Sequence, residues 1–162
     1  MKRYIFILLS CFLALPTLAQ QEEDFASNFM RLNAEEVALK CMTVSPSMME
    51  RVLLIPDDSI ECDSLRPLLE QIKSVRVVSN QSTNEEVALL YEKAEVLAMY
   101  HPLGYDKVAH NNESAIYLRR RAEHIVEIVL IMQRGNNFCM IDLTGNMTDD
   151  FLSRLNGGET PK

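Results

Sequence analysis

Glu127 is the residue whose position most clearly invites chemistry, because it is the one acidic residue in the apolar run 125–132. A carboxylate in such a run must be ion-paired, hydrogen-bonded or neutralised. In one interpretation, Glu127 faces the exposed side of a sheet and pairs with Arg119 or Arg121 on the neighbouring strand. In the other, it is an acid in a pocket with a raised pKa, and so a candidate functional group.

The other residue types that usually carry catalysis are scattered. The three histidines, His101, His110 and His124, show no zinc-ligand spacing. The sequence contains no Gly-x-Ser-x-Gly element for a serine nucleophile. We therefore predict no catalytic constellation, metal or cofactor and favour a non-enzymatic protein. The enzymatic alternative is a periplasmic hydrolase that uses Glu127 as acid or base, together with His110 or His124.

An acidic segment follows Pro56. Carboxylates and hydroxyls alternate from Asp57 to Asp63, which is a spacing that can direct oxygens at one calcium ion. The central glycine of a helix-loop-helix calcium site is missing, so we interpret the segment as a solvated loop. Ser59 and Ser64 each follow an aspartate and precede an aliphatic residue. This pattern makes them candidate acceptors for bacterial O-glycosylation.

Cysteine and methionine usage adds little chemistry. Cys41, Cys62 and Cys139 follow the leader region, so at most one disulfide forms within a chain, and the sequence leaves its pairing open. Cys41 and Cys139 lie in predicted strands, where an unreactive buried thiol is expected, whereas Cys62 lies in the acidic loop. Seven of the nine methionines follow the apolar pattern and are interpreted as core residues, with an exposed methionine groove for a flexible ligand as the alternative: Met42, Met48, Met49, Met99, Met132, Met140 and Met147.

The first nineteen residues have the organisation of a secretory signal peptide. Lys2 and Arg3 precede the apolar run 4–15, and 17–19 supply small residues for cleavage after Ala19. The alternative is a lipoprotein signal in which Cys11 is acylated and retained. In both cases we expect an exported protein of the periplasm or cell envelope, or one that is secreted.

Length and charge restrict the remaining possibilities. Residues 20–158 have the size of one domain, followed by a flexible tail, 159–162. The chain of 162 residues carries a net charge of −7, and loss of the leader removes two basic residues and no acidic ones. An acidic chain repels phosphate, so nucleic acid is excluded as a partner, and so is electrostatic attachment to a membrane. The mature chain shows no transmembrane segment, which leaves an envelope protein or a small ligand as the expected partner.

The periodicity changes along the chain from mainly helical to alternating. Helices are expected over 25–32, from Pro46 after the cap Ser45, from Asp63 or Ser64 to Ile72, from the capping box of Thr83 and Glu86 to Ala98, and after Thr148. Strands are expected over 36–44, 75–78, 105–110, 114–121, 124–133 and 137–144. These elements predict a single two-layer α+β domain. Its sheet is mixed but mostly antiparallel, with helices packed mainly on one face.

Three features resemble the bacterial exported domain-of-unknown-function 4252 family. They are the aromatic pair Phe25 and Phe29, the segment 44–49, and the ending formed by 127–130 with 141–147. The resemblance implies an envelope protein of a gut-type Gram-negative bacterium, and it implies no activity. Members often carry a lipid-modified cysteine, and this sequence fits that pattern only through Cys11.

The sequence therefore predicts an uncharacterised exported cell-envelope protein that acts as a binding module through a sheet face or an edge groove. Besides the hydrolase, a second alternative is a regulatory subunit in envelope stress sensing. That alternative predicts a stable protein partner.

Overall fold

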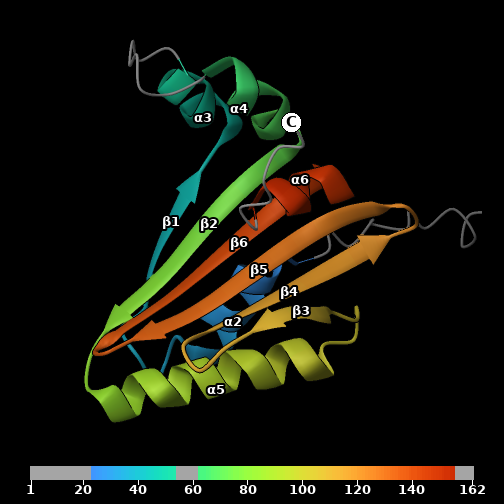
Figure 1. Ribbon diagram of the computed structural model, residues 1–162. Coiled ribbons are helices and arrows are strands. Elements are labelled where there is room, and N and C mark those ends of the chain that lie inside the picture. Colours follow the sequence, from blue (N-terminus) through green and yellow to red (C-terminus); the bar gives the residue numbers. More distant parts are fainter. Residues whose placement is uncertain (1–22, 54–61, 156–162) are drawn as a thin grey trace, which may run out of the picture.

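A six-stranded sheet forms the centre of the computed structural model, which describes residues 23–53 and 62–155 (Figure 1). The spatial order of the strands is β1-β2-β6-β5-β4-β3, and all five pairings are antiparallel. The strands are β1 Lys40–Val44, β2 Ile72–Gln81, β3 Asp106–His110, β4 Ser114–Arg121, β5 His124–Arg134 and β6 Asn137–Met147. The α+β prediction is confirmed, and the described part of the sheet lacks the parallel pairing that a mixed sheet allows.

Two helices, α2 Phe25–Asn33 and α5 Asn84–Tyr100, cover one face of the sheet, called here the helix-covered face (Figure 1). Helix α5 starts as predicted, because the Thr83 side chain accepts a hydrogen bond from Glu86 N. Its apolar stripe and the two α2 aromatics pack on alternate residues of β2, β4, β5 and β6. This main core includes Phe25, Phe29, Val78, Leu90, Tyr117, Ile131 and Phe138.

Among residues 23–53 and 62–155, the helices on the opposite face lie at one end of the sheet (Figure 1). They are α3 Pro46–Leu53, α4 Cys62–Leu69 and α6 Asp149–Leu155. A second, smaller core lies beneath them and includes Met49, Ile72, Leu118, Ile125, Ile128 and Phe151. We call the end of the sheet that lies beneath α3, α4 and α6 the walled end, and the end with the β5–β6 hairpin the free end. The rest of this face has no helix above it among the described residues, and it is called the open face.

The structure corrects several predicted boundaries. Strand β1 starts only at Lys40 and not at residue 36, whereas β2 extends from Ile72 to Gln81, beyond the predicted strand 75–78 at both ends. Pairing with β6 extends β2 at both ends, through polar residues that include Asn80, which has low strand propensity. Strand β6 continues past the predicted residue 144 to Met147 and contains Gly145. A Cβ atom at this position would lie 2.1 Å from Gln71 O, so the close approach of the two backbones requires glycine.

Other predictions fail at single side chains. Cys41 is exposed at the edge strand β1, and Cys139 is half-buried, so the prediction of two buried thiols was wrong. Helix α4 covers Cys62–Leu69 and contains Pro67, whereas the predicted helix continues to Ile72, which is instead the first residue of β2. Several apolar side chains expected in the core are exposed: Leu32, Met42, Met48 and Met99.

Candidate functional site

Glu127 lies on the helix-covered face in the centre of a buried polar cluster. Its side chain has no exposed surface, so the predicted position on the exposed side of the sheet was wrong. The predicted pairing with Arg119 is present: Arg119 Nη2 and Nε donate to Glu127 Oε2 at 2.8 and 2.9 Å. Tyr105 Oη donates to the same oxygen at 2.7 Å, and Phe25 N donates to Oε1 at 2.7 Å. The carboxylate is therefore fully satisfied by donors from three separate segments.

Asp142, on the neighbouring strand β6, is the second acid of this cluster. It is 1% exposed, and its Oδ2 accepts a hydrogen bond from Ala26 N at 2.9 Å. Its Oδ1 is buried and has no hydrogen-bond partner in the described part of the chain. Burial, reinforced by the negative charge of Glu127, raises the pKa of Asp142 from 3.8 to about 8. The cluster therefore holds one ion pair and one neutral acid at neutral pH.

The two acids hold the amino end of α2 against the sheet. The first backbone N–H groups of a helix have no partner within the helix, and carboxylates satisfy them well. Glu127 and Asp142 accept from Phe25 N and Ala26 N, while Asp24 caps the same helix through Ser27 N at 2.8 Å. Arg76 reaches Asp24 at 3.2 Å. The cluster thus fixes the orientation of the first described helix on the domain.

The geometry gives this cluster a structural role and does not assemble the predicted hydrolase site. Both Glu127 oxygens are already hydrogen-bonded, and neither His110 nor His124 donates to them. Arg121 lies opposite His124 at the exposed end of β4, so it is not the partner of Glu127. Burial and the charge of Glu127 also raise the pKa of Tyr105, which keeps its hydroxyl a donor.

The open face presents a different kind of site, built from aligned apolar side chains. Strand register places one side chain from each strand in a row across the sheet. The middle row is apolar from edge to edge: Met42, Val77, Ile141, Leu130, Ile116 and Ala109. The row toward the walled end contains Val44, Val75, Leu143, Ile128, Leu118 and Asp106, and the row toward the free end contains Lys40, Ser79, Cys139, Met132 and Ser114.

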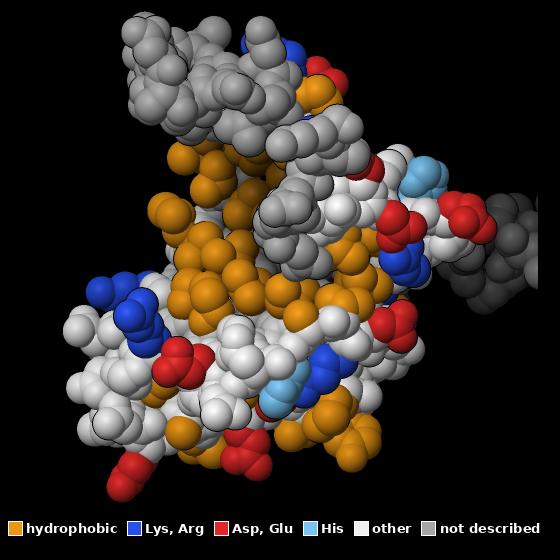
Figure 2. All heavy atoms as spheres, in the orientation of Figure 1, with side chains coloured by type: hydrophobic (Ala, Val, Ile, Leu, Met, Phe, Trp, Pro, Cys, Tyr) orange, Lys and Arg blue, Asp and Glu red, His pale blue; other side chains and the backbone are white. Residues whose placement is uncertain are grey.

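These rows remain accessible. Leu118 and Ile128 are buried beneath the helices at the walled end, but the middle row is half-buried or exposed, and Met42 is 57% exposed. Figure 2 shows apolar side chains gathered on this face, next to the walled end. Soluble monomers seldom expose apolar patches above a few hundred Å² unless the patch binds something. The open face is therefore a candidate binding surface.

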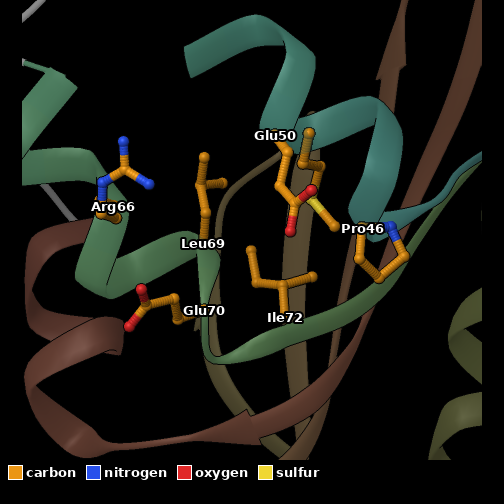
Figure 3. A pocket seen from close by; sticks show the side chains of 7 residues that line it. Pro46, Glu50, Arg66, Leu69, Glu70 and Ile72 are labelled. Carbon is orange, nitrogen blue, oxygen red and sulfur yellow. The ribbon is translucent and has the colours of Figure 1, made fainter. Parts of the chain in front are cut away.

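Two cavities flank the domain. One, of about 270 Å³, lies between α3, α4 and the start of β2, where Glu50, Arg66 and Glu70 surround an apolar floor that includes Leu69 and Ile72 (Figure 3). The other is an apolar groove of about 450 Å³ between α2 and α5. The Lys93–Glu36 ion pair joins the groove to the segment after α2. Neither cavity is lined by Glu127 or Asp142.

Several sequence candidates are not placed at either site. Ser59, Cys11 and the residues Asp57 to Glu61 of the candidate calcium loop lie outside the described residues. Ser64 is in helix α4 and not in a loop. Within 23–53 and 62–155, no group of three or more histidine, cysteine or acidic residues is arranged to hold a metal ion.

Sequence reasoning missed Asp142 and Tyr105, and it predicted a sheet face without helices but did not identify the residues of the open face. Asp142 could have been found, because it lies between Ile141 and Leu143 in an apolar strand and repeats the Glu127 pattern. The open face could not be found in this way. Its apolar residues also look like core residues, and only the packing shows that no described helix covers them.

The fold is an open antiparallel sheet. Helices α2 and α5 cover one face, and α3, α4 and α6 lie at the walled end of the other. The chain belongs to the family described as a domain of unknown function, DUF4252, whose model matches residues 33–155. The match confirms the resemblance, although it begins after Phe25 and Phe29. No curated protein matches this sequence. In the described part of the chain, no helix has both the length and the apolar character needed to cross a membrane.

Proposed function

We propose that this protein is an exported cell-envelope protein that binds a partner through the open face of its sheet and catalyses no reaction. The observation that carries the proposal is the middle row, which is apolar across all six strands and partly accessible. Binding surfaces of proteins have an apolar centre with few charges and a polar rim. The open face has this composition, with Lys40 and Arg134 at its free end.

The buried acids support binding over catalysis. An acid that turns over a substrate must reach it, directly or through one water molecule. Glu127 and Asp142 are instead enclosed by α2, Tyr105 and Arg119, and their hydrogen bonds hold a helix in place. Export is supported by the basic and apolar composition of residues 1–19, which has the order of a secretory leader.

The binding surface is tested with a photo-cross-linking amino acid placed singly at two positions in the native host. Met42 lies on the open face and is 57% exposed, and Met99 lies on α5 and is 56% exposed. Because the exposure is matched, the two positions should differ only in what contacts them. We expect cross-linked products from position 42 and few from position 99. Equal products from both positions, or none from either, would refute the proposed function.

A further inference from the structure

We infer that α2 is a strap that can leave the sheet while the rest of the domain stays folded, and that a proton held between two buried carboxyl groups beneath it controls this release. The inference does not depend on the partner of the open face, because it concerns the helix-covered face. It starts from Glu127 and Asp142, which lie on the neighbouring strands β5 and β6 and both accept from the first turn of α2.

The geometry of these two acids requires a proton. Glu127 is fully buried and Asp142 is 1% exposed, and two buried like charges near each other are unfavourable. Glu127 keeps its charge because it binds Arg119, with Oε2 and Nη2 2.8 Å apart. Asp142 Oδ1 accepts from no donor in the described part of the chain, so it is the oxygen that is free to carry the proton. Burial, the charge of Glu127 and a hydrogen bond to the Glu127 side chain all favour the protonated form of Asp142.

The two arginines at the cluster are engaged by other carboxylates. Arg76 lies opposite Asp142 in the strand register, but its guanidinium binds Asp24 at 3.2 Å. Arg119 binds Glu127. Asp24 adds a further negative charge near Asp142, which also favours the proton. The remaining titratable side chains at the cluster are Tyr105 and His101, whose rings lie 5.1 Å apart.

The position of α2 allows it to separate without breaking the sheet. It is the first described element, residues 34–39 connect it to β1, and all five strand pairings form without it. The apolar groove of about 450 Å³ lies between α2 and α5, so the two helices are not closely packed along this line. The Lys93–Glu36 ion pair at the groove is exposed, and such pairs contribute little. The attachment of α2 therefore rests on its buried aromatics, Phe25 and Phe29, and on the polar cluster.

Release of α2 changes the proton affinity of Asp142. While α2 is attached, burial raises the pKa of this carboxyl from 3.8 to about 8, and the hydrogen bond from Ala26 N opposes the rise only in part. After release, water reaches the carboxyl and its pKa returns toward 3.8. Release therefore gives up a proton, and the equilibrium constant for release should rise about tenfold for each pH unit between these two values. Acidic conditions hold the strap closed, and a rise in pH loosens it.

Release would expose apolar surface that α2 now covers. The Phe29 ring stacks on Phe138, with ring centroids 5.6 Å apart, and the same core contains Val78 and Met140. The two faces of the sheet therefore differ. The apolar residues of the open face are accessible at any pH, whereas those beneath α2 become accessible more often as the pH rises.

The inference is tested by amide hydrogen exchange of the purified protein at pH 5 and pH 7, with each rate divided by that of an unstructured chain at the same pH. This ratio gives an opening constant for each helix. The amides of α5, which packs along the main core, serve as the reference for unfolding of the whole domain. We expect α2 to open at least about tenfold more readily than α5 at both pH values, and its opening constant to rise about 100-fold from pH 5 to pH 7.

A variant identifies the proton. Asp142→Asn has no proton to lose but keeps an acceptor for Ala26 N, so it should largely abolish the pH dependence of the α2 opening constant. The control Asp150→Asn, at an exposed acid of α6, should retain it, and His101 is present in all three proteins.

Two results would overturn the inference. Equal opening constants for α2 and α5 in the wild type would show that α2 leaves only when the whole domain unfolds. The same pH dependence of the α2 opening constant in the wild type and in Asp142→Asn would show that this proton does not control release. The first comparison needs only the wild-type protein, so it decides the matter even where the variant does not fold.

Discussion

Asp142 should make the stability of this protein fall as the pH rises. The pKa of its carboxyl is about 8 in the folded chain and 3.8 when unperturbed, so the folded state binds one more proton than the unfolded state between these values. The contribution of this proton to the free energy of unfolding is fully present below pH 4 and is lost progressively as the pH rises toward 8. One proton corresponds to about 1.4 kcal/mol per pH unit, so the free energy of unfolding should fall by about 3 kcal/mol between pH 5 and pH 7.

The variant Asp142→Asn isolates this effect. Its amide resembles the neutral carboxyl, keeps an oxygen to accept from Ala26 N, and has no proton to lose in this range. The other titratable groups around the site, Glu127, Tyr105 and Asp24, are present in both proteins. The difference between the two pH profiles therefore reports the Asp142 proton.

The assay is urea unfolding at pH 5, 6 and 7, with the free energy of unfolding extrapolated to water. The advantage of Asp142→Asn over wild type should grow by about 3 kcal/mol from pH 5 to pH 7. The control Asp150→Asn alters an exposed acid on α6 and should give a profile parallel to wild type. Parallel profiles for Asp142→Asn and wild type would refute the assignment of a retained proton to Asp142.

Three further predictions concern the same domain. Glu127→Gln should lower the free energy of unfolding by about 3–5 kcal/mol, because it leaves the buried Arg119 guanidinium without its carboxylate. The control Glu123→Gln, at an exposed turn, should lower it little. Equal losses in the two variants would contradict the buried ion pair. Gly145→Ala should destabilise the chain by about 3 kcal/mol, because its Cβ would collide with Gln71 O; an unchanged urea midpoint would show that the two backbones are further apart. The intact mass of the native protein should correspond to a chain that begins at Gln20. The mass of an acylated chain that begins at Cys11 would show instead that the leader is a lipoprotein signal. A chain that retains Met1 would contradict export.

The sequence was most informative where one local pattern determines one element. Alternation in the last third of the chain located β4 at its observed bounds and placed β5 inside the sheet, and the capping box located the start of α5. Strand β2 was only partly predicted, because polar residues at its ends, Asn80 among them, are held in the ladder by pairing with β6, which a local pattern cannot reveal.

The candidate sites show the same limit. The sequence identified Glu127 and predicted Arg119 or Arg121 as its ion-pair partner, because a charge in an apolar strand needs a cross-strand neighbour; the structure selects Arg119. It could not reveal that α2, about a hundred residues earlier, covers this carboxylate with its first N–H groups. The open face was hidden for the converse reason: Val77, Ile141 and Leu130 have core composition but lack a covering layer among the described residues.

The central claim, that a partner covers the open face, is tested most directly by oxidative footprinting of two methionines in the intact cell envelope. Met42 and Met99 are 57% and 56% exposed in the isolated chain, so without a partner they should oxidise at similar rates. We predict that Met42 is protected several-fold relative to Met99 in the intact envelope, and that the two residues oxidise at similar rates in the isolated chain. Equal oxidation of Met42 and Met99 in the intact envelope would contradict the claim.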